Sequence, residues 1–193
     1  MNAEQIAPAL DEVEAAVQPY APAALFTLAT EGYQTLFEIL IACIVSVRTL
    51  EEDTLAVSRR LFSIARTPAD IAALADDELI ALLEGSTFPK PKVQQIKGIA
   101  ERAEREFNGV LPADYDALLS FHGVGAKCAS LALGVATGET PHTPVDTHVH
   151  RVVNRWGVVD TKTPEKTMIT LDAVLTESDR VRINRLLVPF GKH

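Results

Sequence analysis

The sequence has few cysteines. Among its 193 residues there are two, Cys43 and Cys128. A structural zinc site or an iron–sulfur cluster is commonly held by four thiolates, so the cysteines alone can supply neither. Both lie in apolar helical patterns, which favours buried free thiols over a disulfide.

Long apolar runs are also missing. None approaches the roughly 18 residues of a membrane-spanning helix. The N-terminus, MNAEQIAPALDEVEAAV, carries acids where a secretory signal has a basic start and an apolar segment. The sequence therefore predicts a cytoplasmic protein without a membrane segment. At 193 residues the chain has room for one large or two small domains.

Basic residues are fewer than acidic ones, 18 against 26, and the formal net charge is −8. Such a charge disfavours binding to a polyanion, but it is unevenly distributed. Residues 1–80 hold 13 acids and 4 bases, whereas residues 81–193 hold 13 acids and 14 bases. Because the local field decides such binding, we expect any polyanion-binding surface in the second half.

The alternation of apolar and polar residues that is typical of strands is absent, as are sequence repeats, so the sequence predicts an all-α protein. Residues 37–47, FEILIACIVSV, are apolar almost all round, which indicates a helix buried on most sides. Thr49 and Thr67 are predicted helix N-caps, the second with Pro68 at the first helical position. The expected helices span residues 3–17, 35–47, 50–65, 76–84, 92–107, 112–119, 125–136, 146–156, 164–176 and 178–187, with one more beginning at Pro68.

The stretch from Leu118 to Arg155 carries the chemical signal. Gly123, Val124 and Gly125 join two helical segments, which predicts a helix-hairpin-helix over about residues 112–136. The glycines permit positive φ and the close approach of another backbone. The free amide groups at the start of the second helix bind a phosphate without basic side chains. A plain helical turn closed by glycines is the alternative.

Lys127 and Asp146 each stand at the start of a helix, one connector apart. The positive dipole end of the helix and the apolar neighbours Ala126 and Cys128 are expected to lower the pKa of Lys127 and make it a better nucleophile. The alternatives are a lysine that reaches solvent or a phosphate, and an aspartate that only caps its helix. Both features together favour catalysis.

These residues carry a family resemblance. Phe121–Ala129 and Val145–His148 resemble the helix-hairpin-helix/Gly-Pro-Asp DNA glycosylases, and among them endonuclease III most of all. The likeness extends over roughly residues 29–191. It implies two helical domains with a DNA-binding cleft between them, one from residues 29–140 and the other from residues 1–28 plus 141–193.

The resemblance implies a base excision repair enzyme that is both a DNA glycosylase and an abasic-site (AP) lyase. The damaged nucleotide, an oxidised pyrimidine in double-stranded DNA, is rotated out of the duplex. Lys127 attacks the sugar and forms a Schiff base, Asp146 stabilises positive charge on the sugar, and β-elimination nicks the strand. The protein is expected to act as a monomer, associated with the nucleoid if the source is bacterial.

The resemblance also assigns DNA contacts. Arg48 and Phe88 occupy the space left by the flipped base, where relatives commonly have glutamine and leucine. The expected DNA-binding residues are Gly123, Val124, Gly125, Ala126, Arg48, Phe88, Lys92, His148 and Arg151. Two departures lie in the hairpin region: Phe121-His122 replaces the usual Leu-Pro, and Cys128 replaces Thr or Ser. This member is expected to differ from its relatives there.

Rival functions follow from the same residues. One is a non-catalytic or lyase-only helix-hairpin-helix DNA-binding protein. A monofunctional glycosylase fits less well, because such relatives lack Lys127, and the adenine-mismatch branch has a glutamate where this chain has Ala42-Cys43. A metal site at His148 and His150 is disfavoured because these side chains point about 200° apart on a helix.

The resemblance implies a [4Fe–4S] cluster only if the natural chain continues past His193 with the four cysteines of the family. The chain itself supports no cofactor and no metal site.

Overall fold

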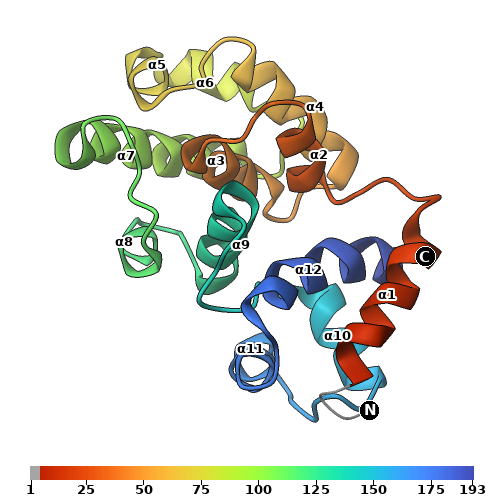
Figure 1. Cartoon of the computed structure of the whole chain (residues 1–193). Coiled ribbons are helices and arrows are strands. Elements are labelled where there is room, and N and C mark those ends of the chain that lie inside the picture. The colour runs from red at the N-terminus through yellow and green to blue at the C-terminus, as the bar shows by residue number, and fades with distance from the viewer. Residues whose placement is uncertain (1–4) are drawn as a thin grey trace.

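A computed structural model describes residues 5–193, which form twelve helices and no strand (Figure 1). The predicted all-α class is confirmed, and the start expected at Ala3 lies outside the described residues. Within the described part, no helix is both long and apolar enough to cross a membrane. The helices are α1 (Ile6–Val17), α2 (Ala24–Thr30), α3 (Leu36–Ser46), α4 (Glu51–Phe62), α5 (Pro68–Ala73), α6 (Asp76–Leu82), α7 (Pro89–Phe107), α8 (Tyr115–Leu119), α9 (Ala126–Thr137), α10 (Thr147–Arg155), α11 (Pro164–Asp172) and α12 (Glu177–Lys192).

The buried apolar side chains form two clusters. The larger draws its residues from α2 through α9, between Ala24 and Leu133. The smaller joins α1 to α10, α11 and α12, and the first helix, red in Figure 1, packs against the blue α12 near the C-terminus. We propose two domains on this basis, and because α2 belongs to the larger cluster, we place the first boundary before Ala24 and not at residue 29.

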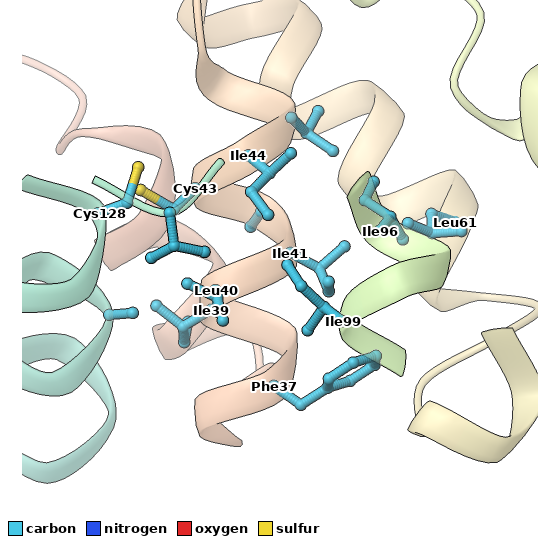
Figure 2. Packing of buried hydrophobic residues seen from close by; sticks show 14 of the residues in the cluster. Phe37, Ile39, Leu40, Ile41, Cys43, Ile44, Leu61, Ile96, Ile99 and Cys128 are labelled. Carbon is cyan, nitrogen blue, oxygen red and sulfur yellow. The ribbon is translucent and has the colours of Figure 1, made fainter. Parts of the chain in front are cut away.

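Helix α3 is the centre of the larger cluster. Thr35 accepts a hydrogen bond from the amide of Glu38, whose carboxylate bonds back to the amide of Thr35, and this capping box starts the helix. Every residue from Phe37 to Val45 is buried, as predicted for an all-round apolar helix (Figure 2). Each buried Leu or Ile contributes about 1.5–3 kcal/mol to the stability of the fold. Helix α3 therefore fixes the positions of the loops that adjoin it.

One helix was not predicted and one predicted N-cap was wrong, for related reasons. α2 was not predicted, because Ala23 in its N-cap position offers no side-chain acceptor. The amide of Ala24 instead donates a hydrogen bond to the carboxylate of Glu51, which is distant in sequence. Thr49 does not cap α4, where Leu50 holds the cap position. The hydroxyl of Thr49 instead accepts hydrogen bonds from other segments of the chain.

Other boundaries moved by a few residues. The predicted cap at Thr67 is confirmed, with Asp70 completing a capping box. α7 begins at Pro89, three residues earlier than expected, because proline suits the first helical position. α12 runs beyond the expected end at residue 187 and reaches Lys192, with Pro189 inside it.

Candidate active site

A tight hairpin joins α8 to α9. Gly123, in its turn, has φ +79°, a left-handed conformation that favours glycine. A Cβ atom there would lie 2.1 Å from Nε2 of Gln95 in α7, so a side chain at this position would also displace the amide of Gln95. Gly125 differs, since its φ is −93° and a Cβ atom would meet nothing within 4 Å.

The start of α9 is free of a capping side chain. Gly125 holds the N-cap position and makes no side-chain hydrogen bond. The amides of the first turn therefore keep their donor capacity, and the helix dipole adds partial positive charge there. Val124 is buried and anchors the turn, while Gly123 and Gly125 are exposed. This arrangement can accept an anion with main-chain donors alone.

Lys127 and Asp146 line the same cavity, which has a volume of about 40 Å³. Lys127 comes from the first turn of α9, and Asp146 holds the N-cap position of α10. Asn184 of α12 also lines the cavity, so the walls combine residues of the larger apolar cluster with a helix that packs in the smaller one. The folded chain thus brings together the two residues that the sequence marked as catalytic. A cavity of this size holds about one water molecule.

The pKa of Lys127 is raised, so the predicted lowering was wrong. Burial alone would lower it. The sulfur atoms of Cys43 and Cys128 and the carboxylates of Asp146 and Glu51 outweigh burial, because each favours the charged ammonium form. Lys127 therefore needs a proton acceptor before it can act as a nucleophile.

Asp146 caps α10 and also lines the cavity, so the interpretation as a helix cap and the interpretation as a catalytic carboxylate are compatible. Its Oδ1 atom accepts hydrogen bonds from the amides of His148 (2.9 Å) and Val149 (2.8 Å). These bonds fix the carboxyl group and leave Oδ2 with no hydrogen bond to the described residues.

Glu51 is a member of this site that sequence reasoning missed. It lines the cavity from the first turn of α4. Its carboxylate bonds the amide of Ala24 and lies 3.6 Å from Nζ of Lys192. In the sequence it was one of three acids at a helix start, where acids are common for reasons of the helix dipole alone. No local pattern distinguished it from its neighbours.

Arg48 and Phe88 are exposed on two adjoining loops. The hydroxyl of Thr87 donates a hydrogen bond of 2.7 Å to the carbonyl oxygen of Arg48. Phe88 is 60% exposed. Both residues have left-handed backbones, with φ 56° for Arg48 and 54° for Phe88. Their entry into DNA remains a prediction, and their location at neighbouring loop tips supports it.

Lys92 was predicted to bind DNA, and the structure contradicts this. Its ammonium group is buried and donates hydrogen bonds to three oxygen atoms of the protein, so it is not free to contact DNA. Arg151 donates to the carbonyl oxygen of Gly191 in α12 and lies beside His148. Contacts of His148 and Arg151 with DNA remain predictions.

Comparison with known proteins places this chain in a family. The model of the HhH-GPD superfamily base excision DNA repair proteins matches residues 41–177, which include the hairpin, Lys127 and Asp146. The chain belongs to this superfamily. Endonuclease III of Thermotoga maritima is 36% identical over 156 residues, covering 81% of this chain and 73% of that protein. Endonuclease III-like protein 1 of Bos taurus is 35% identical over 158 residues, covering 81% of this chain but 52% of its own length.

Solved structures agree with this assignment. A trapped covalent intermediate of endonuclease III with DNA superposes with a TM-score of 0.85 at 28% identity, covering all of this chain and 87% of that one. A non-covalent endonuclease III–DNA complex matches equally well. The prediction of an endonuclease III-like base excision DNA glycosylase is confirmed.

The iron–sulfur cluster of endonuclease III does not fit the thiols of this HhH-GPD chain. Cys43 and Cys128 are free and buried, as predicted, and Figure 2 shows their sulfur atoms side by side between α3 and α9. A cluster needs four thiolates, and these two supply half of them, inside the apolar core. Among residues 5–193, no group of three or more His, Cys, Asp or Glu is placed to hold a metal ion.

Proposed function

We propose that this HhH-GPD protein is a bifunctional DNA glycosylase and abasic-site lyase that acts as a monomer on damaged duplex DNA. The observation that supports it best is the meeting of Lys127 and Asp146 in one cavity. A glycosylase that uses only water needs the carboxylate but not the lysine. Oxidised pyrimidines are the proposed lesions, in keeping with the likeness to endonuclease III.

The reaction begins with the lesion nucleotide rotated out of the duplex, because its sugar carbon is unreachable within the base stack. The neutral amine of Lys127 attacks C1′ and forms a C–N bond. The glycosidic bond breaks, its electron pair leaves with the base, and the base takes a proton. The ionised carboxylate of Asp146 stabilises the positive charge that develops on the sugar during this exchange.

Strand cleavage follows from the covalent intermediate. Ring opening gives an imine between Lys127 and C1′. Loss of a proton from C2′ then breaks the C3′–O bond, and the 3′ phosphate leaves with the electron pair. Water hydrolyses the imine and frees the lysine. Because the pKa of Lys127 is raised, the ammonium must first give up a proton, and the carboxylates of Asp146 and Glu51 line the same cavity.

Substrate entry requires movement, since a cavity of about 40 Å³ does not admit a nucleoside. Ala23–Phe26, at the start of α2, form one wall of it. The carboxylate of Glu51 accepts a hydrogen bond from the first amide of α2. We propose that this segment shifts when the flipped nucleotide enters.

Borohydride trapping tests the proposal. Duplexes that carry an abasic site or thymine glycol are incubated with the protein and sodium borohydride, which reduces the imine to a stable adduct. The wild type should form a covalent adduct with both, and Lys127→Ala should form none. Lys162→Ala is the control, because Lys162 lies outside the cavity. Adduct formation by Lys127→Ala at the wild-type level would overturn the assignment.

The same duplexes separate the rival functions. A bifunctional enzyme excises thymine glycol and nicks both duplexes. A lyase-only protein nicks the abasic duplex and leaves thymine glycol in place. A DNA-binding protein without catalysis retards both duplexes in a gel and nicks neither.

A further inference from the structure

Lys92 joins two surface loops from inside the protein. It lies near the start of α7 and is 5% exposed. Its Nζ atom donates hydrogen bonds to the carbonyl oxygens of Val45 (2.7 Å) and Val47 (3.0 Å) and to Oγ1 of Thr49 (2.9 Å). All three N–H groups of the ammonium are therefore used.

The buried charge is stabilised by a helix end. Val45 and Val47 lie at the C-terminus of α3, where the last carbonyl groups lack partners within the helix and carry partial negative charge. Burial lowers the pKa of Lys92 to about 8. A cation held this way, away from water, fixes the positions of the oxygens around it.

A second residue ties the same two loops together. The amide of Thr87 donates to Oγ1 of Thr49 (3.1 Å), and its hydroxyl donates to the carbonyl oxygen of Arg48 (2.7 Å). The end of α3 with the loop that follows it, residues 45–49, is thus joined to the segment 87–92 by hydrogen bonds from both Thr87 and Lys92.

The residues at the centre of this network are Arg48 and Phe88. Each has a left-handed backbone without being glycine, which persists only where the surrounding structure enforces it. The side chains are exposed, and the apolar side chains of Val47 and Leu50 are exposed beside Arg48 in sequence. The hydrogen bonds of Lys92 and Thr87 therefore fix the backbone around Arg48 and Phe88, while the side chains of these two residues stay exposed to solvent.

Helix α7 also connects this unit to the hairpin. Gln95 lies three residues after Lys92, so both side chains project from one face of the helix. The side-chain amide of Gln95 lies against Gly123, where it leaves no room for a Cβ atom. One turn of α7 therefore sets the position of the loop tips relative to the start of α9.

We propose that Lys92 is a positioning residue for base extrusion, which holds Arg48 and Phe88 as one rigid unit at a fixed place relative to the hairpin. The inference rests on the proposed function and on the prediction that these two side chains fill the space left by the flipped base. Unstacking a base requires both tips to enter the duplex together. A preorganised pair avoids the ordering of two separate loops at that moment.

The test uses 2-aminopurine placed beside a tetrahydrofuran abasic-site analogue, because the fluorescence of this base rises on unstacking and needs no catalysis. At saturating protein, the wild type should raise the fluorescence. Lys92→Met removes the donors and keeps the chain length, and Thr87→Val removes the bond to Arg48. Both should lose most of the rise. Lys90→Met is the matched control, because it removes one charge from an exposed lysine in the same turn and should keep the rise.

Excision gives a second measurement. Under single-turnover conditions, Lys92→Met should slow thymine glycol excision about tenfold more than cleavage at a preformed abasic site, which has no base to extrude. Thr87→Val should also slow thymine glycol excision more than abasic-site cleavage. Because this change is nearly isosteric, its effect separates loss of positioning from loss of the fold. A wild type that unstacks 2-aminopurine but forms no borohydride adduct would refute the proposed chemistry and leave this inference standing. Full fluorescence with both variants, or none with the wild type, would overturn the inference.

Discussion

The thiol of Cys128 is hydrogen-bonded to the sulfur of Cys43, although the two residues come from α9 and α3. This bond lowers the pKa of Cys43 to about 7 and raises that of Cys128 well above its ordinary value. The thiol of Cys43 therefore becomes an anion more easily. Lys127 directly precedes Cys128 in the chain, and both sulfur atoms raise the pKa of Lys127.

Replacing both cysteines by alanine should move the activity of Lys127 to lower pH. A thiolate favours the ammonium form, so its removal lowers the pKa of Lys127 and increases the neutral amine at a given pH. The rising limb of the pH–rate profile for abasic-site cleavage is expected to shift toward acid. Single-turnover rates between about pH 5 and 9 measure it, a range that includes the usual optimum of general acid–base catalysis. An unchanged or alkaline-shifted limb would contradict the electrostatic role of the thiols.

Glu51→Gln should shift the same limb in the same direction. The carboxylate of Glu51 raises the pKa of Lys127, so the neutral amide lowers it. The bond to the amide of Ala24 also changes from charged to neutral, which weakens the hold on α2. Glu52→Gln is the matched control, since it removes the same charge from the next, exposed residue of α4. Equal shifts in the two variants would mean that net charge, and not position, sets the pKa.

What the sequence predicted well has a local cause. The burial of α3 follows from an apolar pattern within one segment, and the cap of Thr67 follows from Pro68 and Asp70 close to it. Gly123 combines a turn position with a residue that tolerates positive φ, so the local sequence predicts the hairpin without any tertiary contact. The cysteine pair was half predicted: burial and free thiols follow from the pattern, but not the bond between them.

What the sequence missed depends on contacts between distant segments. The pKa of Lys127 rises because side chains from α3, α4 and the start of α10 surround it, whereas its helix position and immediate neighbours predicted the opposite. Lys92 lies near exposed prolines and lysine in sequence, yet its amine ends among carbonyls that are 45 and 47 residues away. Glu51 carries no motif. In each case the surroundings of the charged group are set by segments that are distant in sequence.

The two hairpin glycines should respond differently to alanine. Gly123→Ala meets a left-handed backbone and must displace the side chain of Gln95, so we expect it to lower the free energy of unfolding by about 1–2 kcal/mol. Gly125→Ala has an ordinary backbone and open space, so stability should change by less than about 0.5 kcal/mol. Its methyl group would, however, stand where a phosphate approaches the amides of α9.

Gly125→Ala should therefore weaken binding to an abasic duplex roughly tenfold, equivalent to about 1.4 kcal/mol. Thermal unfolding measures the stability of both variants, and fluorescence anisotropy at fixed salt measures the affinity. Wild-type affinity in Gly125→Ala would show that the start of α9 does not bind the phosphate backbone.

Asp146→Asn separates capping from catalysis, because asparagine caps a helix about as well as aspartate. Its side-chain oxygen can still accept from the amides of His148 and Val149, so the melting temperature should stay close to that of the wild type. The amide carries no charge and cannot stabilise the developing positive charge on the sugar. Base excision should fall by a factor of about 100 or more. Asp146→Ala is the comparison, since it should lose the cap as well and unfold more easily, by about 1 kcal/mol. If Asp146→Asn keeps full activity on thymine glycol, the carboxylate is only a helix cap, and Lys127 acts without it.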